Sequence, residues 1–319
     1  MKDIVLFDTS IASENGGDRI IMDYCLRALD TLNDISFFTH LPTHDYLGKV
    51  GRSKLRHADL SIVCGTNLLT SHVLSYKQWM IDLASLFSIQ NIKLMGVGWW
   101  QYQDEPDLLT RSILLRILDN GHLHSVRDRY TENKLKQIGL TNVIYTSCPT
   151  MWELSKEKCL QIPKFKKDAV ISTLTSYKKN IAHDTELFNI LLANYKTVYV
   201  WIQSYDDYKY LDDLGFLNKV NIVGPSLKCY DKILSEGQVD YIGTRLHGGI
   251  RALNHCIRTV IISCDNRAQE ISNDTGLPII KENEISELLP KWINSEVLTD
   301  IRIPQQNIIQ WKESLMKEL

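Results

Sequence analysis

The residue types best suited to chemistry occur together in the segment 240–249, which reads DYIGTRLHGG. Its first half resembles the end of a buried strand, and a helix is expected to begin at residues 247–249. Free N–H groups and the positive dipole at a helix start favour a phosphate or carboxylate. An arginine there can add a bidentate clamp, and paired glycines allow close approach to the backbone. The predicted donor-binding residues are Arg127, Arg245, Leu246, His247, Gly248 and Gly249.

His247 is the candidate for proton exchange. The positive end of a helix dipole favours the neutral imidazole, which can accept or return a proton. A structural interpretation stays open, in which the glycines ease a turn, Arg245 forms a salt bridge and His247 bonds to backbone. For one such residue alone the structural interpretation is favoured, whereas the combination favours an anion site.

A second cationic residue, Arg127, follows an expected strand in the sequence Ser125-Val126-Arg127-Asp128. Ligands of open α/β sheets bind beyond the carboxyl ends of the strands, so Arg127 is expected to reach the same cleft from the other domain. The alternative is that Asp128 caps the next helix and Arg127 is a solvated charge. Arg127, Arg245 and His247 are therefore the predicted catalytic residues.

Candidate acceptor-binding residues come from two further places. The turn Asn15-Gly16-Gly17-Asp18 suits close approach of a ligand or of sugar hydroxyls, but lacks the Gly-x-Gly-x-x-Gly pattern of a dinucleotide site. Trp99 and Trp100 follow a strand and could stack on a sugar ring, with core packing as the alternative. His122 and His124 alternate along a strand without a third ligand, so no metal site is predicted.

Alternating strands and helices must position these residues. Apolar periodicity predicts strands at 4–7, 35–38, 60–63, 92–97, 123–126 and 143–145, and helices at 20–32, 76–87, 108–118 and 130–138. The pattern restarts with strands at 169–172, 198–202, 220–223, 241–243 and 259–262. This rhythm predicts the α/β class, with two Rossmann-like domains of parallel strands facing a central cleft.

The boundary between the predicted domains, 1–160 and 161–319, is placed in a Lys-rich stretch at 155–167 that contains Pro163. The first domain is expected to form the acceptor side and the second to hold the anion site. Ile308, Trp311 and Leu315 predict a C-terminal helix that packs back on the first domain, or instead caps its own.

Composition limits the partners and the compartment. The 36 Lys and Arg residues nearly balance 38 Asp and Glu, giving a net charge of −2 and no field that recruits nucleic acid. Seven scattered Cys residues fit neither a disulfide framework nor a zinc site and favour a reducing cytoplasm. Neither a secretory signal nor a membrane-spanning stretch is predicted.

The chain resembles the polysaccharide pyruvyl transferase family. The resemblance rests on segment 241–249, the step 125–128 and the turn 15–18, which occur in the family's order and approximate spacing. Cys64-Gly65-Thr66-Asn67 is similar to the family's glycine-rich turn after the third strand, which adds Asn67 to the candidate acceptor residues. A frequent Tyr and Lys of the family are replaced by Cys264 and Arg267.

This resemblance implies a GT-B-like fold and transfer of a pyruvyl group from phosphoenolpyruvate, as co-substrate, to sugar hydroxyls, usually giving a cyclic ketal. It implies no other cofactor, and the two arginines with helix amides would bind the phosphate and carboxylate without a metal. The saccharide acceptor can be lipid-linked, nucleotide-linked or polymeric, and a lipid-linked one would require peripheral membrane association. The oligomeric state stays open. The alternatives are a GT-B-like glycosyltransferase with a nucleotide-sugar donor, and a catalytically silent sugar-binding protein.

Overall fold

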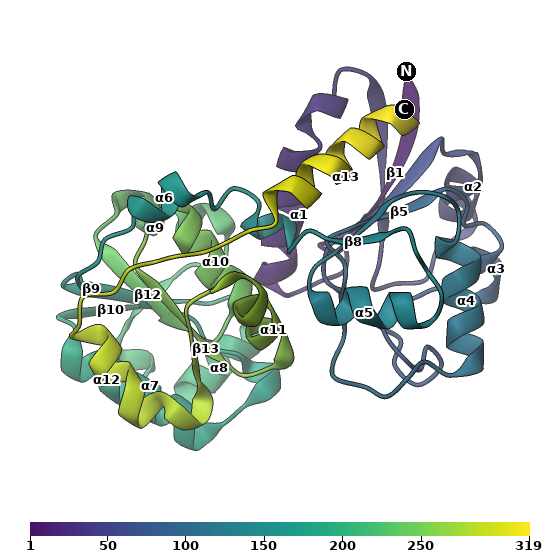
Figure 1. The fold of residues 1–319 in the computed structure, drawn as a ribbon. Helices are drawn as coiled ribbons and strands as arrows, with labels where there is room; N and C mark the ends of the chain where they lie inside the picture. The colour runs from purple at the N-terminus through teal and green to yellow at the C-terminus, as the bar shows by residue number, and fades with distance from the viewer. The chain divides into compact units, whose positions relative to one another are not determined.

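A computed structural model describes residues 1–319 apart from the side chain of Leu83, and the chain divides into two compact units (Figure 1). Unit 1 contains Met1–Ser13, Ile21–Trp152 and Ile303–Leu319, and unit 2 contains Glu14–Ile20 and Glu153–Arg302. The division therefore falls after Trp152, whereas the sequence predicts it near residue 160. The reason is local, because helix α6 (Lys156–Leu160) belongs to unit 2 and Lys158 Nζ there donates to Asn254 Oδ1 at 3.1 Å.

Unit 1 is built on a parallel sheet with the strand order β2-β1-β3-β5. Every residue of β3 and β5 is buried, as expected when both faces of a parallel sheet are covered. A parallel pair β7-β8 continues from it through a bridge between Val97 and Val126, and β4 pairs with β6. The strands are β1 Lys2–Asp8, β2 Ser36–Pro42, β3 Leu60–Cys64, β4 Asn67–Leu69, β5 Ile92–Met95, β6 Gly98–Trp99, β7 His124–Val126 and β8 Val143–Tyr145.

The helices of unit 1 depart from the predicted alternation in two places, the first being α2, which the sequence analysis did not predict. Only Leu83–Leu86 is helical in the segment 76–87, where the sequence predicts a single long helix. The buried Trp79 packs edge-on against Phe7, at 5.4 Å between ring centroids, which holds this segment as an irregular loop. The helices are α1 Gly16–Ala28, η1 Asp30–Leu32, α2 Lys49–His57, α3 Leu83–Leu86, α4 Leu108–Leu118, α5 Arg129–Gln137, η2 Pro149–Met151 and the C-terminal α13 Gln305–Glu318.

The C-terminal helix α13 packs within unit 1 (Figure 1). Trp311 is fully buried and its ring lies 5.7 Å from that of Trp152. The buried Lys93 on β5 donates to Glu318 Oε1 at 2.6 Å, and Asn307 Nδ2 donates to the Tyr145 carbonyl at 2.8 Å. Apolar packing and a buried charge pair thus join the end of the chain to the first sheet.

Unit 2 contains one parallel sheet with the order β11-β10-β9-β12-β13-β14. β12, at the centre, is buried along its whole length, so the segment that follows it leaves from the middle of the sheet. The elements are η3 Ser176–Lys178, η4 Leu217–Lys219 and η5 Glu282–Glu284; strands β9 Ala169–Ser172, β10 Thr197–Trp201, β11 Asn221–Val223, β12 Val239–Gly243, β13 Thr259–Ser263 and β14 Ile279–Lys281; and helices α6 Lys156–Leu160, α7 Ile181–Asn194, α8 Tyr205–Asp213, α9 Leu227–Glu236, α10 Leu246–Asn254, α11 Asn266–Thr275 and α12 Ile285–Ile293.

Candidate functional site

Helix α10 begins without a capping side chain directly after the central strand β12. Its N-cap residue is Arg245, which makes no side-chain cap hydrogen bond, and the first helical residue is Leu246. By contrast, Ser204, Ser226 and Asp265 cap the neighbouring helices α8, α9 and α11. The first-turn N–H groups of a helix have no intrahelical acceptor, so an uncapped start offers them to an anion.

Arg245 is held by protein groups and is not the free clamp that the sequence suggested. Its Nη2 donates to both carboxylate oxygens of Asp207 at 2.7 Å, and its Nε donates to the Leu174 carbonyl at 2.9 Å. Both charged side chains are buried. The guanidinium also lies 4.8 Å from the centroid of the Tyr177 ring. This is the salt-bridged geometry of the structural interpretation, and it fixes the strand-to-helix turn.

The turn 15–18 lies against the start of α10, within unit 2. Asn15 Oδ1 accepts from the Gly17 N–H at 3.0 Å and from Arg245 Nη1 at 3.4 Å. A Cβ placed on Gly17 would lie 3.5 Å from His247 Nδ1. The sequence assigns Asn15, Gly16, Gly17 and Asp18 to the first domain, and this is corrected, because Glu14–Ile20 groups with unit 2. Two helix starts, of α1 and α10, therefore meet around His247.

The two glycines of α10 have different roles. Gly249 faces the sheet, where a Cβ would come within 2.5 Å of Ile261 Cγ1 and 2.8 Å of Tyr241 Cε1. Its N–H already donates to the Arg245 carbonyl at 3.1 Å, so Gly249 serves helix packing and not the predicted donor contact. Gly248 instead faces polar atoms, since a Cβ placed there would lie 3.1 Å from Tyr241 Oη. Leu246 and His247 are both buried.

Hydroxyl groups fix the end of β12 beneath this site. Tyr241 Oη donates to the Arg245 carbonyl at 2.8 Å and bonds Thr173 Oγ1 at 2.6 Å. Thr244 Oγ1 bonds Thr175 Oγ1 at 2.9 Å. A Cβ on Gly243 would lie 2.6 Å from the Thr173 backbone nitrogen, so only glycine fits there. Burial raises the pKa of Tyr241, which keeps this hydroxyl a neutral hydrogen-bonding group.

Arg127 lies in unit 1 in a buried ion pair. Its side chain is 2% exposed, and its Nε donates to Asp128 Oδ2 at 2.9 Å. Asp128 Oδ1 accepts from the Thr131 N–H at 2.8 Å and so caps α5, as the alternative proposed. That alternative is wrong for Arg127, which is not solvated. The guanidinium also bonds Asn67 Oδ1 and lies over Gly98, where no Cβ would fit.

The remaining acceptor candidates of unit 1 have separate positions. Trp99 is fully buried, and its indole Nε1 donates to Gln103 Oε1 at 3.0 Å. Stacking of Trp99 on a sugar is therefore corrected to core packing. Trp100 is half-buried beside the Tyr76 ring, at 4.5 Å between centroids. Asn67, Trp99 and Arg127 thus form one cluster, while the structure brings Asn15, Arg245 and His247 into another.

Two residues of the unit 2 cluster were missed from the sequence. Asp207 on α8 neutralises Arg245, and Gln203, which follows β10, places its amide beside Gly16 and Gly248. Gln203 closely follows the carboxyl end of a strand, which is the usual position of ligand-binding residues in α/β sheets. That position is a signal that could have marked it.

The segment 262–267, which contains Cys264 and Arg267, borders the same turn. Lys178 Nζ donates to the Cys264 carbonyl at 3.0 Å, and Cys264 Sγ faces the Thr244 carbonyl at 3.7 Å. Burial raises the pKa of the Cys264 thiol to about 12, so it is not a thiolate nucleophile at neutral pH. Burial opposes ionisation of Asp265, but the charge of Arg267 outweighs it and lowers the Asp265 pKa to about 2.

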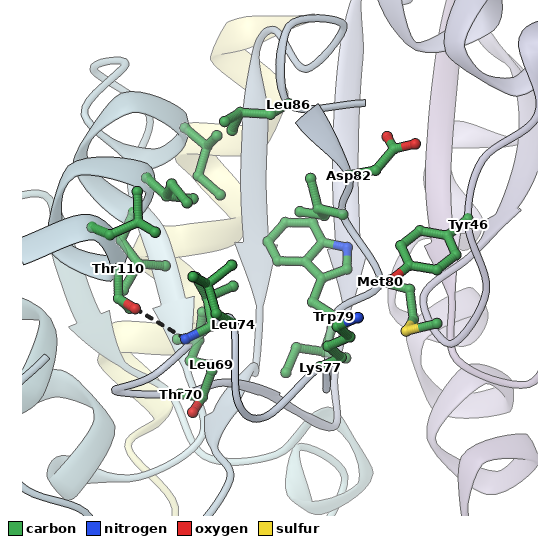
Figure 2. A pocket seen from close by; sticks show the side chains of 17 residues that line it. Tyr46, Leu69, Thr70, Leu74, Lys77, Trp79, Met80, Asp82, Leu86 and Thr110 are labelled. Atoms are coloured by element: carbon green, nitrogen blue, oxygen red, sulfur yellow. Dashed lines mark hydrogen bonds between the residues drawn. The ribbon is translucent and has the colours of Figure 1, made fainter. Parts of the chain in front are cut away.

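Unit 1 also contains a mostly apolar cavity of about 380 Å³ (Figure 2). Figure 2 shows the Trp79 indole between Leu74 on one side and Tyr46 with Met80 on the other. Thr110 Oγ1 accepts from the Val73 N–H at 3.0 Å at its edge. A lining of this kind suits an apolar group, so the anion chemistry is better placed at the helix starts.

His122 and His124, at the start of the predicted strand, bond to protein groups. His124 Nε2 donates to the Leu118 carbonyl at 2.7 Å, and His122 pairs with Glu318 at 3.1 Å. Across the described part of the chain, no group of three or more His, Cys, Asp or Glu side chains is arranged to hold a metal ion. None of the helices that the structure describes combines the length and apolar character of a bilayer-spanning segment.

Comparison with solved structures defines the class of the fold. The UDP-GlcNAc 2-epimerase of Methanocaldococcus jannaschii, solved with UDP-GlcNAc and UDP, matches 99% of this chain and 99% of its own, with a TM-score of 0.58 and 11% identity. MnaA of S. aureus, solved with UDP, covers 100% of this chain and 98% of its own, with a TM-score of 0.59 and 11% identity. The chain therefore has a GT-B-like α/β fold with two domains of parallel strands.

A sequence comparison identifies the family. The family model described as polysaccharide pyruvyl transferase matches residues 15–266, which include the turn at Asn15, Arg127 and the Arg245–His247 segment. A search of functionally curated proteins gives no match. The chain belongs to the polysaccharide pyruvyl transferase family.

Proposed function

We propose that this protein transfers the pyruvyl group of phosphoenolpyruvate to two hydroxyls of a saccharide, giving a cyclic ketal and inorganic phosphate. The observation that carries the proposal is the uncapped start of α10, which presents His247 beside the glycine turn of α1. A helix start favours an anionic ligand, and phosphoenolpyruvate carries a phosphate and a carboxylate. Family membership supports the choice of a pyruvyl donor.

The proposed reaction needs two proton transfers. The oxygen of one sugar hydroxyl bonds to the central enol carbon and gives up its proton to the acid/base, and a proton is delivered to the terminal carbon, which becomes a methyl group. The second hydroxyl then displaces phosphate from the resulting tetrahedral centre, and its proton leaves with the phosphate. His247 is the proposed acid/base, because it sits at the helix start where the anion would bind.

The arginines enter this proposal with different roles. Because Arg245 is already paired with Asp207, it acts by positioning the α10 start and the Asn15 turn. The catalytic role of Arg127 stays a prediction, and within unit 1 its guanidinium is bonded to Asp128 and Asn67. The first-turn amides and the helix dipole of α10 are proposed to stabilise the leaving phosphate.

Phosphate release from phosphoenolpyruvate tests the proposal, with a panel of methyl glycosides and nucleotide sugars as acceptors. We expect acceptor-dependent release by the wild-type chain and a loss of about 10²–10⁴-fold in His247→Gln. His255→Gln is the matched control, because His255 lies at the opposite end of α10. Equal rates in His247→Gln and wild type would refute the role of His247.

A nucleotide-sugar glycosyltransferase is the second candidate. Its support is the similarity in fold to the two UDP-bound structures, since a helix start can also hold a diphosphate. The same panel separates the two candidates. Transfer from a nucleotide sugar without phosphoenolpyruvate would favour the glycosyltransferase.

A further inference from the structure

Gln203 carries a buried amide that lacks hydrogen-bond partners. Gln203 is 4% exposed and lies two residues after the end of β10. Neither Oε1 nor Nε2 has a partner among the residues that the structure describes. A buried amide without partners has lost its bonds to water, so folded proteins seldom keep one unless a ligand or an ordered water completes it.

The amide lies between the starts of α1 and α10. A Cβ placed on Gly16 would lie 3.2 Å from Gln203 Oε1, and one on Gly248 would lie 3.5 Å from Nε2. Gly16 is the first residue of α1, and Gly248 is in the first turn of α10. Glycine at both positions leaves the backbone open beside the amide. Gln203 is therefore placed next to the anion site and not within a packed apolar core.

The unpartnered atoms define the chemistry of the missing group. Nε2 donates and Oε1 accepts, so an anion alone would satisfy Nε2 and leave Oε1 without a donor. Two neighbouring sugar hydroxyls satisfy both, because one can donate to Oε1 while the other accepts from Nε2. We propose that Gln203 binds a pair of neighbouring hydroxyls of the saccharide acceptor and thereby determines which hydroxyls face the donor.

This inference rests on the proposed function and adds the acceptor side to it. A cyclic ketal joins two hydroxyls of one sugar, so the enzyme must distinguish sugars by the geometry of their hydroxyl pairs. A planar side-chain amide beside the α10 start is suited to that distinction, because its donor and acceptor lie in one fixed plane. Gln203 is then a specificity-determining residue, and His247 remains the proposed acid/base.

Gln203→Leu tests the inference by three measurements on the purified chain. These are the unfolding midpoint in urea, calorimetric binding of phosphoenolpyruvate, and binding of the methyl glycosides of glucose, galactose and mannose. We expect an equal or higher unfolding midpoint, because no internal hydrogen bond is lost. Phosphoenolpyruvate affinity should stay within about twofold, whereas affinity for the preferred glycoside should fall at least about tenfold. Gln269→Leu, on α11, is the control.

Each other outcome has a defined meaning. A lower unfolding midpoint would overturn the inference, because the amide would then make structural bonds. Loss of phosphoenolpyruvate binding with unchanged glycoside binding would also overturn it, because Gln203 would contact the donor. Failure of all three glycosides to bind the wild-type chain would count against it as well. Glycoside binding that depends on Gln203, in a chain that does not bind phosphoenolpyruvate, would refute the proposed function alone.

Discussion

Asp207→Leu is expected to destabilise unit 2 strongly, because it leaves the Arg245 guanidinium buried without its counter-ion. The Arg245 side chain is 6% exposed and that of Asp207 is 1% exposed, so water cannot replace the lost carboxylate. Removing one partner of a buried pair costs about 3–5 kcal/mol. For a domain of this size, that loss corresponds to a fall in melting temperature of about 6–20 °C.

The assay is urea unfolding of the wild type and three variants. Asp300→Ala is the matched control, because its pair with Arg302 is exposed and should contribute less than about 1 kcal/mol. The double variant Asp207→Leu/Arg245→Met removes both charges and should recover part of the lost stability. A loss below about 1 kcal/mol in Asp207→Leu would refute this reasoning, because Arg245 would then be free to act as a ligand clamp.

Three further predictions concern packing, protonation and metals. Gly249→Ala should lower the free energy of unfolding in urea by about 1–3 kcal/mol, because its Cβ would overlap Ile261. The control is Gly48→Ala, whose Cβ meets no atom within 4 Å and which should change stability by less than about 1 kcal/mol. Equal effects of the two substitutions would contradict the packing role of Gly249. Burial lowers the pKa of the His124 imidazole from 6.5 to about 4. Between these pH values the imidazole is protonated in the unfolded chain and neutral in the folded one. The free energy of unfolding should therefore fall by about 3 kcal/mol as the pH drops from 6.5 to 4. A titration of stability that is equally steep in His124→Gln would exclude this residue as the cause. Phosphate release should persist after EDTA treatment, because helix amides are proposed to bind the phosphate; complete loss with rescue by a divalent cation would contradict it.

The local pattern was enough to predict many elements of the fold. β8 and α4 begin and end at the predicted residues, because one is a short β-branched run and the other an amphipathic segment capped by Asp107. The segment 76–87 was mispredicted as one helix because its apolar spacing is helical, whereas Trp79 contacts Phe7, which lies 72 positions earlier in the sequence. Contacts of that sequence separation leave no local pattern.

In the candidate site, too, local features could be predicted from the sequence and long-range contacts could not. The helix start at Leu246 followed from the glycines and the preceding strand, and it lies one residue from the predicted position. The ion-pair partner of Arg245 could not be predicted in this way, because Asp207 lies on another helix, far from Arg245 in the sequence. The missing hydrogen bonds of Gln203 also need the whole structure, since an unpaired amide is defined only by everything packed around it.

The most direct test of the central claim is a structure of the chain with bound phosphoenolpyruvate. We predict that its phosphate or carboxylate accepts hydrogen bonds from the first-turn amides of α10, with the enol carbons within reach of the His247 ring. Phosphoenolpyruvate bound away from the α10 start, with His247 remote from its carbons, would contradict the proposed pyruvyl-transfer site.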